Sequence, residues 1–141
     1  MNSKYKIGFT CGAFDLTHAG HYLMFKDCKK NCEVLIVGVQ TDPSIDRPEK
    51  NKPVQSLEER MIQLKSCKYI DEVVIYETEA DLFNLLKSLP IDVRFLGEDW
   101  RGRNFTGHEL PIQIIYNPRD HGFSSSSLRD RIYNAEKKSR E

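Results

Sequence analysis

The chain lacks long hydrophobic runs and any excess of charge. No apolar run approaches the roughly 20 residues that a transmembrane helix needs, so we expect no membrane-spanning segment and no membrane partner. Lys and Arg number 21 and Asp and Glu also number 21, which gives no reason to expect a nucleic acid as the partner. Residues 1–5 carry charge without an apolar signal core, which predicts a cytoplasmic protein. A length of 141 residues suits one domain spanning 1–141.

Common metal and nucleotide motifs are also missing. The four cysteines include no C-x-x-C pair, so we expect reduced, small apolar side chains and no metal held by the protein. Neither the G-x-G-x-x-G of dinucleotide-binding folds nor the P-loop G-x-x-x-x-G-K occurs. A phosphate site in this chain must therefore be built in another way.

Strand and helix patterns alternate along the whole chain. Strands are predicted over 5–11, 34–39, 72–76, 92–97 and 111–116, and helices over 19–31, 57–69, 79–88 and 123–136. This alternation predicts an α/β fold, a Rossmann-like doubly wound five-stranded parallel sheet of order 3-2-1-4-5. We expect the ligand at the carboxyl ends of the strands, above the first and fourth. Residues expected to face the core from the first two helices are Leu23, Met24, Cys28, Met61, Ile62, Leu64 and Cys67.

The stretch 12–21 joins the first strand to the first helix and carries two histidines. Free N–H groups and the positive dipole end of a helix favour phosphate binding at such a junction. The spacing places His18 and His21 on one face of the first helical turn, and Gly20 between them allows close approach of a nucleotide. Both imidazoles can donate hydrogen bonds to phosphate oxygens.

His18-Ala19-Gly20-His21 resembles the HxGH motif of the nucleotidyltransferase superfamily, which includes class I aminoacyl-tRNA synthetases. The longer run, with Gly12, Phe14 and Asp15 ahead of it, resembles the small cytidylyltransferases, above all glycerol-3-phosphate cytidylyltransferases. The resemblance implies an enzyme that transfers CMP from CTP to a small phosphorylated alcohol. It also implies that Mg²⁺ travels with the nucleotide.

Three further stretches carry the same resemblance. Residues 118–129 resemble the R-x-x-G-x-S-[ST]-[ST] motif that holds the triphosphate, although His121 stands where that family usually has Glu. Residues 97–100 resemble the family's G-D-D-W sequence, and 50–60 resemble its basic loop and E-x-x-R helix start. An acidic stretch at 79–82 stands where that family has an acceptor-binding Lys, which speaks against glycerol 3-phosphate itself.

These matches define the expected site. His18, His21, Lys52 and Arg119 are the expected catalytic residues, positioning and neutralising phosphates. Nucleotide contacts are also expected from Ala13, Phe14, Gly20, Gly97, Asp99, Trp100, Gly122, Ser124, Ser125 and Ser126, and acceptor contacts from Asp15, Lys50, Arg60, Arg101 and Arg103.

Two other functions stay open on sequence alone. One is an adenylyltransferase that uses ATP to make a product of the FAD or CoA-precursor type, and the other is a nucleotide-binding domain without turnover. The resemblance implies a homodimer with the first helix near the interface. Exposed aromatic side chains at Tyr22 and Phe25, and the loop 101–108, are expected to contribute to it.

Overall fold

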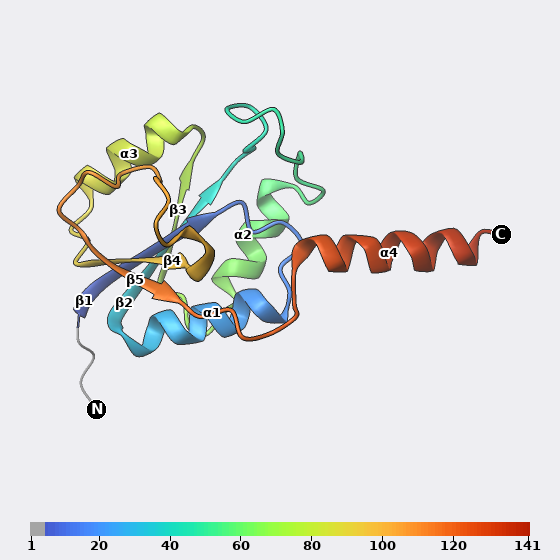
Figure 1. The fold of residues 1–141 in the computed structure, drawn as a ribbon, viewed down its shortest axis with the longest axis horizontal. Helices are drawn as coiled ribbons and strands as arrows, with labels where there is room; N and C mark the ends of the chain where they lie inside the picture. The colour runs from blue at the N-terminus through green and yellow to red at the C-terminus, as the bar shows by residue number, and fades with distance from the viewer. Residues whose placement is uncertain (1–4) are drawn as a thin grey trace.

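A parallel five-stranded sheet runs through the centre of the computed structural model, which describes residues 5–141 (Figure 1). Its strand order is β3-β2-β1-β4-β5, which confirms the predicted topology. The chain moves outward from β1 to β3, then crosses back to β4 beside β1, so the order reverses between β1 and β4. The strands are β1 (Tyr5–Gly12), β2 (Cys32–Gln40), β3 (Glu72–Tyr76), β4 (Val93–Gly97) and β5 (Gln113–Asn117).

Four α-helices and one short 3₁₀ helix connect and follow the strands. They are α1 (Ala19–Lys30), α2 (Leu57–Lys65), α3 (Glu79–Ser88), η1 (Glu98–Trp100) and α4 (Ser125–Ser139). Ser56 begins α2 as predicted, because its side chain accepts a hydrogen bond from the N–H of Glu59 at 3.1 Å. The helix ends earlier than predicted, since the Ser66 hydroxyl bonds back to the carbonyl of Ile62 at 2.8 Å.

Apolar side chains fill both faces of the sheet, which makes it doubly wound. Phe25, Cys28 and Leu64 from α1 and α2 pack on one face, and Leu82 and Leu86 from α3 pack on the other. This arrangement buries β1 and β2 between two layers, as their nearly continuous apolar sequence requires.

The structure corrects two of the predicted core positions. Leu23 is 44% exposed and Ile62 is 60% exposed, so neither lies in the core. Phe25, two residues after Leu23 and therefore on the opposite side of α1, is fully buried. A helical stripe faces the core only over part of the turn, and both exposed residues lie beyond its edge.

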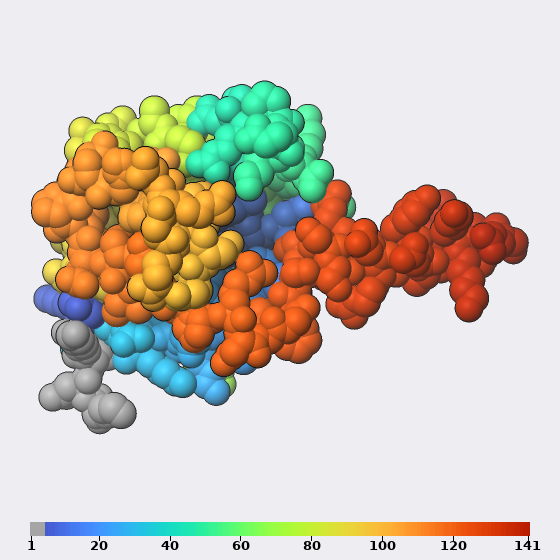
Figure 2. Space-filling view, in the orientation of Figure 1, coloured from blue at the N-terminus to red at the C-terminus, as the bar shows by residue number. Residues whose placement is uncertain are grey.

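The C-terminal helix α4 leaves the body on the side of the strands' carboxyl ends and extends outward (Figures 1 and 2). None of its residues is buried, and Ile132 and Tyr133 are 51% and 63% exposed. Within residues 5–141, no helix is long and apolar enough to cross a membrane.

Candidate active site

A cavity of about 390 Å³ lies at the carboxyl ends of β1, β4 and β5, where the strand order reverses. In Figure 2 the blue N-terminal segment forms the floor of a hollow between the gold residues near 100 and the orange residues near 120. The cavity wall includes many of the predicted nucleotide contacts: His18, Gly20, His21, Gly97, Asp99, Trp100, Arg119, Ser124, Ser125 and Ser126.

The two histidines cap the helix that they begin. The Nδ1 atom of His18 accepts a hydrogen bond from the N–H of Gly20 at 3.0 Å, and the N–H of His18 donates to Nδ1 of His21 at 3.2 Å. The two ring centroids are 4.0 Å apart. Because a backbone N–H occupies each Nδ1, the proton of each neutral ring lies on Nε2. Each ring is thereby held as a donor through Nε2.

Both rings are uncharged at neutral pH. Burial lowers the pKa of His21 to about 4, and the positive charges of His18 and Arg119 act in the same direction. Burial also lowers the pKa of His18, with smaller contributions from His121, Arg119 and Arg131. The protein groups around the two rings therefore disfavour imidazolium, and an anion beside the rings would favour it.

A strained turn positions His21. Phe14 and Leu16 have φ of 51° and 53°, in the left-handed region that side-chain-bearing residues rarely adopt. The Phe14 ring is buried and meets the His21 ring edge-on, with centroids 5.6 Å apart. Phe14 was predicted to contact nucleotide; the structure instead places it beneath His21, in the core cluster.

Both helices that begin at the cavity lack acidic residues in their first turns. By contrast, α2 and α3, which begin elsewhere, carry acidic residues there, where they compensate the helix dipole. At α1 and α4 the positive dipole end is left without a carboxylate. In α4 the side chain of Ser124 accepts from the N–H of Ser127 at 3.0 Å. The positive dipole ends of two helices therefore meet at the cavity, and this favours the binding of an anion there.

His121 is a cavity residue that the sequence reasoning did not place in the site. Its ring packs on Gly20, where a Cβ atom would lie 2.7 Å from His121 Cε1 and 2.9 Å from His18 Cε1. Gly20 is therefore required for this close packing. Nδ1 of His121 accepts from the N–H of Phe123 at 3.2 Å, which again leaves Nε2 as the donor. The sequence signal that could have identified His121 is its position within the predicted triphosphate motif, residues 118–129. Thr10, Met24, Asn117 and Phe123 also line this cavity.

Arg119 and Asp99 face each other across the cavity mouth. Their closest side-chain atoms are 3.8 Å apart and both side chains are more than half exposed, so the pair is weak. Gly97 lets Asp99 fold back, because a Cβ atom there would lie 2.7 Å from Asp99 Oδ1. Trp100 lines the same wall. An anionic ligand can therefore recruit Arg119 at little cost.

Arg60 has a structural role, which corrects the prediction that it contacts the acceptor. Its side chain is 2% exposed. Its guanidinium donates to the carbonyls of Ala13 at 2.9 Å, Gln40 at 2.6 Å and Thr41 at 2.7 Å. These bonds tie the ends of β1 and β2 together beside the turn that carries the histidines.

Asp15 also ties loops together. Its carboxylate accepts from the N–H groups of Val54 and Gln55, both at 2.9 Å, and lies 3.6 Å from Arg129. It thereby joins the turn at 12–21 to the loop before α2. Asp15 does not line this cavity, nor the second cavity that is described below.

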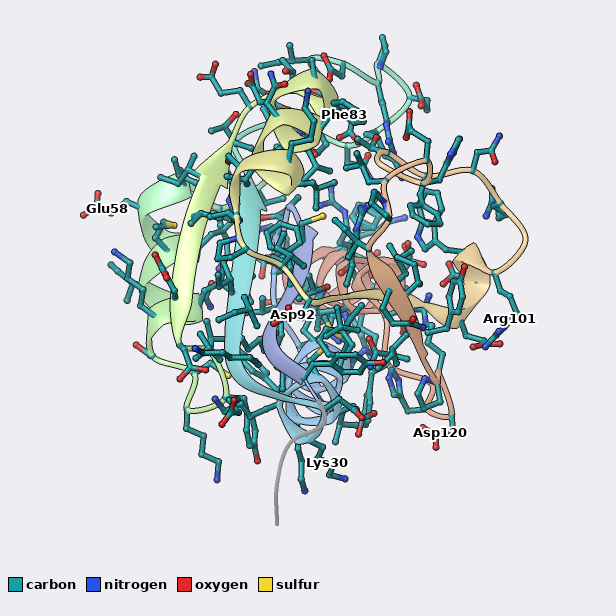
Figure 3. All side chains as sticks on the ribbon, turned by 90° about the vertical axis from the view of Figure 1, so that its left-hand side faces the viewer. Lys30, Glu58, Phe83, Asp92, Arg101 and Asp120 are labelled. Atoms are coloured by element: carbon teal, nitrogen blue, oxygen red, sulfur yellow. The ribbon has the colours of Figure 1, made fainter. Side chains whose placement is uncertain are left out.

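The remaining predicted residues lie outside the main cavity. Lys52 is exposed in the loop before α2, and Gly122 is exposed beside His121. Arg101 pairs with Glu98 at the periphery of the molecule (Figure 3), and its guanidinium lies 4.4 Å from the centroid of the Tyr116 ring on β5. Arg103 lies over the Trp100 ring, 5.4 Å from its centroid. Their predicted ligand contacts stay predictions.

A second cavity of about 290 Å³ lies beside the first. Cys11, Leu96 and Trp100 line both, so they form a common wall. Ala13 and Lys50, predicted for nucleotide and acceptor respectively, line the second cavity.

The described residues do not form a metal site. Within residues 5–141, no three His, Cys, Asp or Glu side chains come together in a way that could hold a metal ion. Among residues 5–141, Asp99 is the only residue with a side-chain carboxylate that lines the first cavity. Oxygen ligands for Mg²⁺ would therefore have to come mainly from a bound triphosphate.

The family model described as cytidylyltransferase-like matches residues 9–131. The chain belongs to this family. All four stretches of this chain that resemble cytidylyltransferase motifs lie within the matched range. The parallel sheet, with a cavity at its two histidines, agrees with a nucleotidyltransferase domain. The family assignment therefore confirms the resemblance read from the sequence.

The similar curated proteins are bifunctional ones. The bifunctional protein HldE of Helicobacter pylori (strain HPAG1) is 33% identical over 128 residues, which cover 90% of this chain and 27% of that protein. HldE of Campylobacter jejuni (strain 81116) is 32% identical over 133 residues, covering 94% and 28%. The chain thus spans little more than a quarter of the length of these relatives.

Solved structures share the fold. A lipopolysaccharide core biosynthesis protein from Thermoplasma volcanium has a TM-score of 0.59 and 22% identity, with 92% of this chain and 88% of that one covered. Pantoate-beta-alanine ligase from Francisella tularensis, complexed with beta-gamma ATP and beta-alanine, has a TM-score of 0.55 and 17% identity, covering 92% and 67%.

Proposed function

We propose that this domain transfers CMP from CTP to a small phosphorylated alcohol and releases pyrophosphate. The observation that carries the proposal is the capping histidine pair, which fixes two Nε2 donors at the N-terminus of α1 in an anion-binding cavity. The family description and the resemblance of its motifs to cytidylyltransferases support CTP as the donor.

The proposed reaction is an in-line displacement at the α-phosphorus. An oxygen of the acceptor phosphate forms the new P–O bond, and the bond from the α-phosphorus to the bridging oxygen breaks. The electron pair of that bond leaves with pyrophosphate. The attacking oxygen is already anionic, so no general base is needed, and the enzyme acts by placement and charge stabilisation.

The residues around the cavity have defined roles in this proposal. His18 and His21 donate through Nε2 to α-phosphate oxygens as charge builds on them. Arg119, freed from its weak pair with Asp99, and the N-terminus of α4 at 124–126 hold the leaving pyrophosphate. Mg²⁺ bound to the triphosphate would neutralise part of its charge.

ATP is the competing donor. A protein of the same fold is described as complexed with beta-gamma ATP, and the chain departs from the cytidylyltransferase pattern at His121 and at 79–82. A binding domain without turnover is less consistent with the cavity, because simple binding does not require two fixed imidazole donors beside a second, cationic cavity.

Product analysis separates these functions. The protein is incubated with Mg²⁺ and either CTP or ATP, together with glycerol 3-phosphate, glucose 1-phosphate or phosphocholine. We expect pyrophosphate and a CDP-linked product, with CTP much preferred. Equal or better turnover with ATP would replace the donor in the proposal, and nucleotide binding without pyrophosphate release with any acceptor would leave only the binding function.

A further inference from the structure

Arg94 is a buried cation without a counter-charge. It lies on β4, between β1 and β5 in the sheet, and is 3% exposed. None of the ion pairs among residues 5–141 includes it, and its Nε atom is buried without a hydrogen-bond partner. Its guanidinium donates to the carbonyl of Thr106, lies 3.9 Å from Cys11 Sγ, and lies 5.1 Å from the Phe105 ring centroid. A buried, unpaired charge is costly to a fold, so a ligand that pairs with it is the physical reason to keep it.

The second cavity lies against this guanidinium and is itself cationic. Its charged lining residues are Arg47, Lys50, Arg94 and Glu79, which sum to a net charge of +2. A phosphomonoester carries roughly −1.5 to −2 at neutral pH. The charges therefore match one phosphate group that enters the cavity.

Glu79 supplies a second kind of contact in the same cavity. Its Oε1 accepts from Thr106 Oγ1 at 2.7 Å and from Arg47 Nη2 at 3.0 Å, and its Oε2 accepts from Gln40 Nε2 at 3.3 Å. A carboxylate can accept about four hydrogen bonds, so one more donor can be accommodated. A hydroxyl group of a ligand fits this acceptor.

We propose that the second cavity binds a phosphorylated, hydroxyl-bearing acceptor, with its phosphate held by Arg94 at the wall shared with the nucleotide cavity and its hydroxyls read by Glu79. This inference rests on the proposed function, which requires an acceptor phosphate beside the α-phosphate. Cys11, which contacts Arg94, belongs to the wall that both cavities share. The phosphate would thus face the nucleotide, and the body of the acceptor would extend toward α3. Under this proposal, Glu79 at the acidic start of α3 selects acceptors that carry hydroxyl groups.

The test compares Arg94→Met with the wild type and with Lys87→Met, a control on an exposed Lys of α3 outside the cavity. Pyrophosphate release is measured against the concentration of glycerol 3-phosphate or glucose 1-phosphate, with the nucleotide fixed. Arg94→Met should raise the acceptor KM by roughly tenfold or more, the cost of a charge-assisted hydrogen bond. The KM for nucleotide should stay near the wild-type value. The melting temperature should fall, because Arg94→Met also removes the hydrogen bond to the Thr106 carbonyl.

Two further measurements keep the test decisive. Arg94→Lys keeps the charge but lacks the planar fork, so it should raise the acceptor KM less than Arg94→Met does. It also provides the test if Arg94→Met does not fold. Calorimetry of glucose 1-phosphate with protein that is saturated with the α,β-methylene analogue of CTP, which cannot release pyrophosphate, reports binding without turnover. Glu79→Gln should weaken glucose 1-phosphate more than phosphocholine, which lacks hydroxyls.

The outcomes separate the inference from the proposed function. An acceptor KM unchanged in both folded Arg94 variants would overturn the inference while leaving nucleotidyl transfer intact. Failure of the wild type to release pyrophosphate with CTP or ATP would overturn the proposed function. In that case calorimetric binding of glucose 1-phosphate that is lost in Arg94→Met would still support the cavity, and no binding would refute it.

Discussion

The backbone N–H of His18 donates a hydrogen bond to Nδ1 of His21, 3.2 Å away, one turn into the helix that the two residues begin. This bond fixes the tautomer of the second ring, while Gly20 fixes that of the first. The sequence HAGH therefore encodes both a helix cap and a pair of oriented donors. Replacing either histidine tests which of these two roles matters for turnover.

We expect His21→Gln and His18→Asn to lower turnover by about a hundredfold or more, the usual loss when one preorganised transition-state donor is removed. Asn retains the ability to cap a helix, so His18→Asn should fold. Nucleotide affinity should change less than turnover. Steady-state kinetics with direct nucleotide-binding measurements check this.

His108 supplies the control for both substitutions. It lies exposed in the loop 101–112 and lines neither cavity. His108→Gln should retain wild-type kinetics. Near-normal turnover in a folded His21→Gln protein would contradict the proposed role of the pair.

Stability should fall as the solution is acidified, in part because of His21. Its pKa is about 4 when folded, against an ordinary value near 6.5, so the unfolded chain binds more protons between these values. The contribution is complete above about pH 6.5 and is lost as the pH falls toward 4, and we expect it to be of order 1–3 kcal/mol in the free energy of unfolding. Denaturant melts at pH 7 and pH 5 measure it, and His21→Gln should reduce the difference.

Triphosphate binding should oppose that trend. An anion beside the ring favours its protonated form, so bound CTP should raise the pKa of His21. NMR titration of the imidazole resonances, with and without CTP, follows this directly. A pKa that does not rise with bound nucleotide would place the triphosphate away from His21.

Arg60 should prove a stability residue. Its guanidinium satisfies three backbone carbonyls in a buried site. Arg60→Met leaves those acceptors unpaired, and we expect a loss of about 2–5 kcal/mol in the free energy of unfolding. Thermal and urea unfolding check this against Arg140→Met, which changes an exposed Arg at the end of α4. A loss below about 1 kcal/mol would be inconsistent with the three hydrogen bonds.

The structural features that could be predicted from the sequence are those that local sequence patterns determine. The continuous apolar run of β2 and the cap at Ser56 are local signals, and the crossover rule then fixes the sheet order. The ligand site of such a sheet is expected at its carboxyl edge, and the structure brings both stretches that were predicted to bind phosphate to one cavity there.

The roles of the arginines depend on long-range contacts and were not predictable in the same way. Arg60 fits the family's E-x-x-R pattern, but its carbonyl partners come from distant turns. Arg94 has an ordinary place in a strand sequence, and only its burial without an ion pair and with an unsatisfied Nε distinguishes it. The pattern of α1 allowed Phe25 either an inward position or a place at a dimer interface, and the structure buries it fully.

The prediction of a homodimer now depends on other residues. With Phe25 in the core and Tyr22 packed against it, the exposed apolar side chains of Ile132 and Tyr133 on the projecting helix α4 are the better candidates for a contact. We expect light scattering at micromolar protein to give about twice the monomer mass of 16.4 kDa. Ile132→Glu should shift that mass toward the monomer. A wild-type mass of 16.4 kDa with and without CTP would rule the dimer out.

The central claim is nucleotidyl transfer, and the fate of each phosphate of CTP tests it most directly. CTP labelled with ³²P at the α position is compared with CTP labelled at the γ position, each with Mg²⁺ and the acceptor that supports turnover. The account predicts that the α label appears in a CDP-linked product, that the γ label appears in pyrophosphate, and that both are lost in His21→Gln. Transfer of the γ label to the acceptor, or release of the γ label as inorganic phosphate with no α label transferred, would contradict it.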